Sequence, residues 1–128
     1  MENSGVVIDT SIFIEHLRAT NKTQTTLWQL SEQTEIFISS VTLYELLMGA
    51  SNHQKHKDVT LVTQNTIVLP FDEEVSKRAA TIYHELRESN KMIEFRDIFI
   101  AATCLTYNLQ VKTLNVNHFN RIEGLKFM

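Results

Sequence analysis

Gly5-Val6-Val7-Ile8-Asp9 decides the fold, because a short apolar run with adjacent β-branched residues leads directly into an aspartate. A run without polar alternation is typical of a strand buried on both faces, and such strands are usually parallel. Four further candidate strands follow at residues 35–38, 66–69, 110–113 and 125–127. Together these runs predict a parallel sheet.

Helical patterns lie between the candidate strands. Asp72, just after Pro70, stands in an N-cap position, and apolar residues follow at helical spacing: Val75, Ala79, Ile82, Tyr83 and Leu86. Ser40 is the expected N-cap of another helix, whose predicted apolar face carries Leu43, Leu46, Leu47 and Ala50. Residues 97–107 are apolar almost all round, as expected of a central, buried helix. Strands alternating with helices predict a layered α/β fold.

Length and composition restrict the class of protein. A chain of 128 residues, with three glycines, one proline and no linker-like stretch, is expected to form a single domain over residues 1–128. Hydrophobic residues make up 43% and charged residues 21%, a balance typical of globular rather than disordered chains. The net charge of −3 argues against a protein that coats nucleic acid through bulk electrostatics.

The expected compartment is the cytoplasm. Cys104 is the single cysteine, so the chain forms no internal disulfide and no thiolate metal site; it lies within an apolar helical pattern and is expected to be buried. The N-terminal residues lack the pattern of a signal peptide. No apolar stretch reaches the length of a membrane span, so no membrane association is expected.

Three carboxylates are candidates for a metal site. Asp9 stands just beyond the carboxyl end of the first strand, where parallel sheets place their sites. Glu45 falls opposite the apolar stripe of its helix, and Asp97 opens the apolar helix, where the helix dipole favours a charged carboxylate. Oxygen ligands of this kind suit Mg²⁺ or Mn²⁺ rather than zinc. Spacing alone leaves each acid open to a plain role as a cap, a turn former or a solvated side chain.

Four segments carry a family resemblance: DTSIFI (9–14), SSVTLYELLMGA (39–50), RDIFIAATC (96–104) and TLNVNHF (113–119). In this order and spacing they resemble the successive signatures of the PIN-domain family. Within that family they are most similar to the VapC-type toxins of prokaryotic toxin–antitoxin pairs. The likeness extends from about residue 6 to residue 125, which is nearly the whole chain.

The resemblance implies a PIN-like three-layer fold, with a central parallel sheet of four or five strands flanked by helices. It also implies an endoribonuclease that depends on Mg²⁺ or Mn²⁺, forms a homodimer and is inhibited by a cognate VapB-like antitoxin. Carried over position by position, Asp9, Glu45 and Asp97 match the family's metal-binding acids. A metal-activated water would then hydrolyse the RNA phosphodiester bond and leave a 5′-phosphate, with Glu45 helping to hold the ion or accepting the proton of the water.

The TLNVNHF segment departs from the fullest family pattern. Many members place an aspartate there, whereas this chain has Asn115. An amide oxygen can bind a cation or a water but adds no negative charge, so we expect weak binding of any second metal ion. Thr10, Ser11 and Thr113 are candidates for hydrogen bonds that orient the carboxylates.

Basic and histidine side chains complete the candidate residues. Arg87, Lys91 and Arg96 precede Asp97, and we expect them to bind RNA phosphates beside the metal. The histidines are scattered and are interpreted as surface side chains, because no cysteine accompanies the His53-x-x-His56 pair. They are His16, His53, His56, His84 and His118.

Other classes of function fit less well. A response-regulator receiver needs an aspartate at the end of its third strand and two acids after its first, whereas this chain has Leu69-Pro70 and a single Asp9. A non-catalytic PIN-like interaction module is an alternative that the three acids disfavour and Asn115 leaves open. A PIN nuclease of RNA processing is a further alternative. A small antitoxin-like reading frame directly upstream would favour the toxin.

Overall fold

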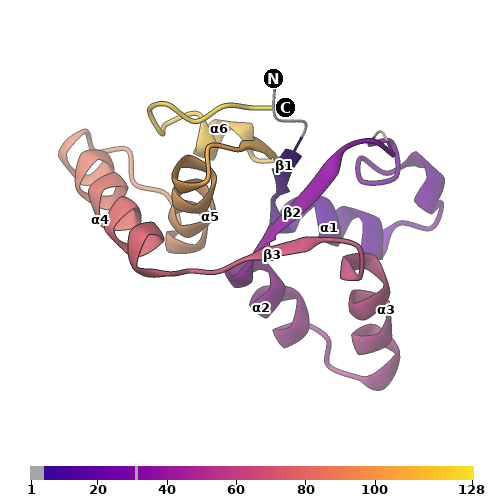
Figure 1. Ribbon diagram of the computed structural model, residues 1–128. Helices are drawn as coiled ribbons and strands as arrows, with labels where there is room; N and C mark the ends of the chain where they lie inside the picture. The colour runs from indigo at the N-terminus through magenta and orange to yellow at the C-terminus, as the bar shows by residue number, and fades with distance from the viewer. Residues whose placement is uncertain (1–4, 31) are drawn as a thin grey trace.

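The computed structural model describes residues 5–30 and 32–128. Within these residues the sheet has four parallel strands in the order β3-β2-β1-β4 (Figure 1). They are β1 (Gly5–Ile8), β2 (Glu35–Ser39), β3 (Ile67–Leu69) and β4 (Gln110–Lys112). The predicted parallel α/β sheet is confirmed, and β1 lies inside it with a partner on each side.

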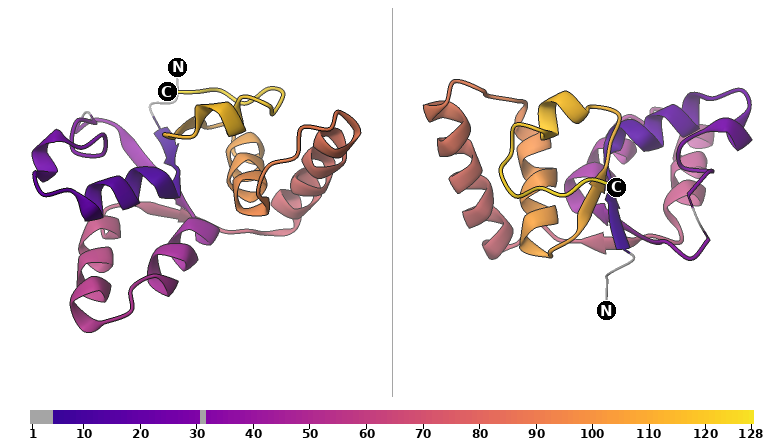
Figure 2. Two further views of the ribbon diagram at one scale, coloured as in Figure 1. Left: turned by 180° about the vertical axis from the view of Figure 1, so that it is seen from behind. Right: turned by 90° about the horizontal axis from the view of Figure 1, so that it is seen from above.

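Helices cover both faces of this sheet. They are α1 (Thr10–Arg18), α2 (Ser40–Met48), α3 (His53–Thr63), α4 (Glu73–Glu88), α5 (Phe95–Thr106) and α6 (Val116–Phe119), with a short 3₁₀ helix, η1 (Lys22–Gln24), after α1. Figure 2 shows α1 and α3 on one side of the sheet and α4 and α5 on the other. The three layers expected from the resemblance are therefore present.

Alternate side chains of β1 supply the two hydrophobic cores. Val7 packs into the core formed with α4 and α5, whereas Val6 and Ile8 pack into the core formed with α1, α2 and α3. All three are fully buried. Because a central parallel strand is covered on both faces, its sequence reads as an unbroken apolar run.

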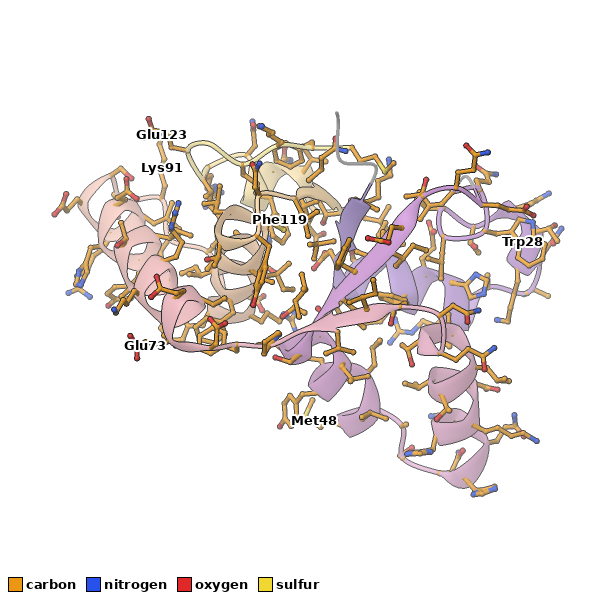
Figure 3. The ribbon with its side chains drawn as sticks, viewed as in Figure 1. Trp28, Met48, Glu73, Lys91, Phe119 and Glu123 are labelled. Atoms are coloured by element: carbon orange, nitrogen blue, oxygen red, sulfur yellow. The ribbon has the colours of Figure 1, made fainter. Side chains whose placement is uncertain are left out.

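Helix α4 follows its predicted pattern closely. The Asp72 side chain accepts a hydrogen bond from Val75 N at 3.0 Å, as an N-cap should, and this bond lowers the pKa of Asp72. The buried residues of α4 are Val75, Ala79, Ile82 and Leu86. Figure 3 labels Glu73 and Lys91 at opposite ends of this helix.

The N-cap predicted for α2 is wrong by one residue. Ser39 is the cap, because its hydroxyl accepts a hydrogen bond from Val41 N at 3.1 Å. The Ser40 hydroxyl instead accepts from Phe71 N at 3.0 Å and ties α2 to the segment after β3. The predicted apolar face is also partly wrong, since Leu47 is 38% exposed while Thr42 is buried. Contacts of α2 with both α1 and α5 determine which side chains it buries.

Two further predictions also need correction: the start of α5 and the strand expected at residues 125–127. Helix α5 begins at Phe95 with Glu94 as its N-cap, so Asp97 lies in the first turn and is not the cap. Residues 125–127 form no strand; Val111 and Phe127 make an isolated parallel bridge, because the chain touches β4 only briefly. Among the described helices, none is long and apolar enough to cross a membrane.

Candidate active site

Asp9 lies immediately after β1 at the carboxyl edge of the sheet. Its backbone N–H donates to Lys112 O at 3.0 Å, which continues the pairing of β1 with β4 by one residue. The side chain is buried, with the residue only 2% exposed, and its Oδ2 accepts hydrogen bonds from Ser11 at 2.7 Å and Thr113 at 2.8 Å. Both bonds end on one oxygen, so neither of them engages Oδ1.

The same two hydroxyl groups join the loops that follow β1 and β4. Thr113 Oγ1 accepts a hydrogen bond from Asn115 N at 2.9 Å, and Ser11 Oγ accepts one from Leu114 N at 3.2 Å. Each hydroxyl thus donates to Asp9 and accepts from the β4 loop. The orientation of the Asp9 carboxylate is therefore fixed by both strands.

Asp97 lies close enough to Asp9 for the two negative charges to interact. Burial is the main cause that raises the pKa of Asp97, and the charge of Asp9 raises it further. A contact with His118 Nδ1 at 3.2 Å and the charge of Arg96 act in the opposite direction. Two buried carboxylates with this little compensating charge favour the binding of a cation.

Glu45 is held from α1 and from α5. The Thr10 hydroxyl donates to Glu45 Oε1 at 2.9 Å and shares a hydrogen bond with the Thr42 hydroxyl at 3.1 Å. Arg96 Nη1 donates to Glu45 Oε2 at 3.0 Å. The Glu45 side chain is 12% exposed, so it lies inward between helices. Both of its oxygens have a protein partner.

These contacts determine which of the acids are suited to bind a metal ion. Within the described residues, no three His, Cys, Asp or Glu side chains are arranged to hold a metal. Asp9 and Asp97 form an electrostatically coupled pair, whereas Glu45 is paired with Arg96. Carboxylate oxygens are the donors that Mg²⁺ and Mn²⁺ prefer, so the chemistry of the acid pair fits such an ion.

His118 is the residue whose role the sequence interpretation missed. It was grouped with the surface histidines, and its side chain is indeed 44% exposed, yet Nδ1 contacts Asp97. A signal was present, because His118 lies within TLNVNHF, three residues after Asn115. The Asn115 side chain makes no capping hydrogen bond at the start of α6.

The three predicted phosphate-binding residues make different contacts, and only Arg96 contacts one of the candidate acids. Arg96 contacts Glu45, but Arg87 donates to the Tyr83 hydroxyl at 2.9 Å on α4. Lys91 lies beyond the C-terminal end of α4 (Figure 3), and its carbonyl accepts a hydrogen bond from Arg121. In the described residues no ion pair joins Arg87 or Lys91 to the three acids.

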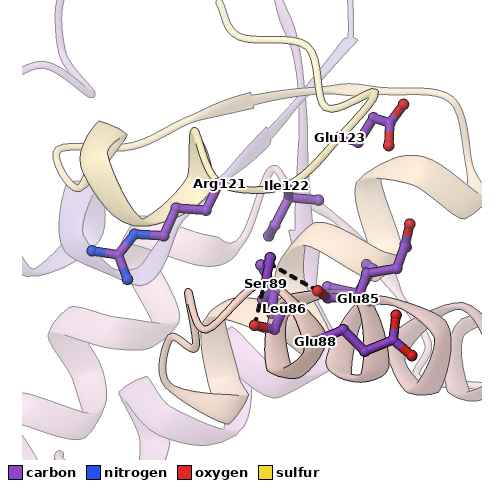
Figure 4. A pocket seen from close by; sticks show the side chains of 8 residues that line it. Glu85, Leu86, Glu88, Ser89, Arg121, Ile122 and Glu123 are labelled. Carbon is purple, nitrogen blue, oxygen red and sulfur yellow. Dashed lines mark hydrogen bonds between the residues drawn. The ribbon is translucent and has the colours of Figure 1, made fainter.

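A separate hollow of about 420 Å³ lies at the C-terminal end of α4 (Figure 4). Its acidic residues are Glu85, Glu88 and Glu123. The Ser89 hydroxyl at its wall donates to the carbonyls of Glu85 and Leu86, which completes the end of the helix. Arg121 is the one basic residue of the lining, so the three glutamates outnumber it and disfavour phosphates, and none of the three candidate acids of the site lines the hollow.

A three-layer parallel fold with buried acids at the carboxyl edge defines an α/β protein with a candidate cation site. The model of the PIN domain family matches residues 6–125, and the chain therefore belongs to the PIN domain family. It is 34% identical to "Ribonuclease VapC1" of Rickettsia felis, over 97% of this chain and 95% of the relative. It is 27% identical to "Toxin FitB" of Neisseria gonorrhoeae, over 89% of this chain and 90% of the relative.

A solved structure agrees in fold. VapBC-1 from nontypeable Haemophilus influenzae contains a chain that matches with a TM-score of 0.82 at 26% sequence identity. The match covers 97% of this chain and 96% of that chain. The family predicted from the four segments is confirmed.

Thr113→Val, with the same substitution at Thr106 as a control, tests the hydrogen bonds around Asp9. We expect Thr113→Val to lower the free energy of unfolding by about 1.5–3 kcal/mol, because it removes a buried hydrogen bond to a charged group. Thr106→Val is the matched control, since Thr106 Oγ1 is buried without a hydrogen-bond partner among the described residues. That control should stabilise the protein by up to about 1 kcal/mol. Urea unfolding in EDTA measures both, and equal effects would contradict the assigned role of Thr113.

Proposed function

We propose that this protein is a divalent-metal-dependent endoribonuclease and the toxin of a toxin–antitoxin pair. The observation that carries the proposal is the burial of Asp97 beside Asp9, which raises the pKa of Asp97 at the edge of the sheet. Support also comes from relatives that carry the names ribonuclease and toxin. The substrate would be RNA, and the ion Mg²⁺ or Mn²⁺.

The proposed roles follow from the contacts. Asp9 and Asp97 would hold the ion, while Ser11 and Thr113 keep the Asp9 carboxylate in place. The ion would polarise the scissile phosphate and lower the pKa of a water. Glu45 would help to hold the ion or accept the proton of that water, with Thr10 fixing its Oε1. Hydrolysis by water needs no 2′-hydroxyl and forms no cyclic phosphate. With the 3′-oxygen as the leaving group, the expected products are a 5′-phosphate and a 3′-hydroxyl.

The departure at Asn115 bears on the number of ions. Asn115 is exposed, and its neutral amide adds no negative charge to the candidate site. We propose that the free protein holds one ion well and a second only weakly. A second ion would then enter mainly with the phosphate of the substrate.

Cleavage of a panel of structured RNAs distinguishes the proposed function from its alternatives. Activity in Mg²⁺ or Mn²⁺ that EDTA abolishes supports the nuclease, and no cleavage in either ion would favour a non-catalytic PIN-like module. Neutralisation by the product of a small upstream reading frame supports the toxin. A lack of such neutralisation would favour a PIN nuclease of RNA processing.

Asp97→Asn tests the acid pair through both stability and activity. Because the pKa of Asp97 is raised above its ordinary 3.8, its stabilising contribution is full below pH 3.8 and is lost as the pH rises through the folded-state value. In EDTA at neutral pH the variant should therefore melt roughly 2–4 °C higher than wild type, with a smaller difference near pH 4. Saturating Mn²⁺ should reverse the order.

RNA cleavage by Asp97→Asn should fall by more than the roughly 100-fold that loss of an outer partner of a metal site causes. The Thr106→Val protein serves as the active control, since Thr106 lies outside the site. Wild-type cleavage by Asp97→Asn at saturating metal would refute the proposed role.

We further propose that the antitoxin covers a groove beside Glu45. The groove has a volume of about 300 Å³ and lies between α1, α2 and α3. Its uncharged lining is Ile14, Leu17, Leu46, Gly49, Ala50 and Val59, and its charged lining is Arg18, Glu45, Lys55 and Asp58. An apolar segment of a partner placed here would sit against Glu45 and block access to the acids. The groove therefore fits an inhibitor of the active site.

Gly49 allows a test of this groove. Its φ is −76°, and an added Cβ would lie 3.5 Å from the Glu45 carbonyl oxygen, so a side chain is tolerated. We expect Gly49→Trp to weaken antitoxin binding at least about tenfold, or about 1.4 kcal/mol, because the indole fills the groove. Gly49→Ala, the control, should bind normally. Unchanged binding of the tryptophan variant, measured by calorimetry with the co-purified antitoxin, would exclude the groove.

The homodimer is proposed to form through the other side of the sheet. A groove of about 340 Å³ between α4 and α5 is lined largely by apolar residues, among them Phe71, Ala80, Tyr83, Phe95 and Phe99. Phe95 is 59% exposed and Phe71 is 37% exposed. Aromatic side chains gathered in this way are typical of interfaces, and this face is separate from the Glu45 groove.

Ala80→Arg tests this interface without disturbing α4. Ala80 is exposed on the helix, so an arginine is compatible with the fold but places a charge in the groove. We expect the variant to be monomeric by light scattering at concentrations where wild type is dimeric. Thr81→Arg adds the same charge at the next residue, outside this groove, and should remain dimeric. A dimeric Ala80→Arg protein would place the interface elsewhere.

A further inference from the structure

Arg96 occupies a carboxylate that the proposed metal site needs. Its Nη1 lies 3.0 Å from Glu45 Oε2, and its Nη2 lies 3.0 Å from Glu94 Oε2. The two nitrogens of one guanidinium thus bridge a partly buried acid and an exposed acid, since the Glu45 side chain is 12% exposed and that of Glu94 is 60% exposed. The remaining Glu45 oxygen accepts from Thr10.

The charges around Arg96 explain why it lies there. Glu45, Glu94 and Asp97 all raise its pKa, so it is a permanent cation among three acids. The Arg96 side chain itself is 54% exposed and can reach solvent or a ligand. Its exposed pair with Glu94 is expected to contribute little to stability. The Arg96–Glu94 pair instead keeps the guanidinium at the rim of the site when the pair of Arg96 with Glu45 breaks.

We propose that Arg96 is a displaceable counter-ion, which neutralises Glu45 in the metal-free protein and turns to an RNA phosphate when a metal ion takes its place. This inference rests on the proposed function. A metal ion and the guanidinium compete for the same Glu45 oxygen and repel each other. A phosphate offers the released guanidinium two oxygens in the geometry that suits it best.

The arrangement couples metal binding to RNA binding. When RNA draws Arg96 away from Glu45, the metal no longer competes with it, and linkage requires the metal to favour RNA binding by the same factor. Arg96 is therefore a positioning residue for Glu45 and a binding residue for RNA. Its removal should move these two affinities in opposite directions, which a purely structural role would not do.

The primary test is calorimetric titration of the metal-free protein with Mn²⁺ in the absence of RNA. We expect Arg96→Ala to bind Mn²⁺ at least about fivefold more tightly than wild type. Arg96→Gln, which keeps a polar side chain but removes the positive charge, should behave alike and guards against misfolding of one variant. Arg18→Ala is the matched control, because Arg18 lines the groove next to Glu45 but forms no described ion pair with it; its affinity should stay within about twofold.

The second measurement is cleavage of RNA, first with RNA varied at saturating Mn²⁺ and then with Mn²⁺ varied at RNA well below its KM. Arg96→Ala should show a higher KM for RNA, while the Mn²⁺ concentration for half-maximal rate falls. Unchanged Mn²⁺ affinity in both Arg96 variants, or tightening of the same size in Arg18→Ala, would overturn the inference.

Asp9→Asn in the same titration separates this inference from the proposed function. Loss of Mn²⁺ binding in Asp9→Asn, with unchanged affinity in the Arg96 variants, would overturn the role of Arg96 alone. Wild-type Mn²⁺ binding by Asp9→Asn, or no binding by any of the proteins, would overturn the metal site and the counter-ion together.

Discussion

The register between β1 and β4 is the constraint on which the site depends. Ile8 pairs with Lys112, so the next residues, Asp9 and Thr113, leave the sheet side by side and their side chains meet at 2.8 Å. A slip of one residue would turn every side chain of the strand to the opposite face. The fully buried Val6, Val7 and Ile8 forbid that slip, because it would exchange the residues that fill the two cores. Core packing thereby fixes the position of the acid.

The negative charges of the candidate acids are the second constraint, and the molecule compensates these charges only in part. Asp97 is 5% exposed, faces the charge of Asp9 and has a partly exposed histidine as its close partner. Glu45, by contrast, is fully paired. The acids nearest the sheet are thus the ones most in need of a cation. Sites that bind ligands commonly keep such uncompensated charge at a cost to stability.

The fold could be read from the sequence wherever burial on both faces left an unbroken apolar run, as in β1, or a strict helical stripe, as in α4. Helix α3 could not, because in its sequence HQKHKDVTLVT only Val59 is buried. The exposed Leu47 shows a different limit. Contacts of α2 with two neighbouring helices decide which side it buries, and the spacing of apolar residues within one helix carries no record of those neighbours.

The candidate site, like the fold, could be predicted from the sequence only in part. The family resemblance singled out Asp9, Glu45 and Asp97 as candidates, whereas their spacing alone left each acid open to a plain structural role. The partners of these acids are long-range: 51 residues separate Arg96 from Glu45, and 21 separate His118 from Asp97. Local spacing contains no information about such pairs. Only the topology, which brings α2, α5 and α6 to one edge of the sheet, makes them neighbours.

Assembly of the site is consequently tied to completion of the fold. Thr113 lies 104 residues from Asp9, and the contact forms only when the last strand pairs with the first. A partly folded chain would have Asp9 without its hydroxyl partners and would lack the loop that carries His118. At the proposed metal site, this prior ordering would make a cation bind the native state far better than the unfolded chain, so binding would stabilise the fold. The same link means that nothing short of the whole sheet can present the acids in their native arrangement.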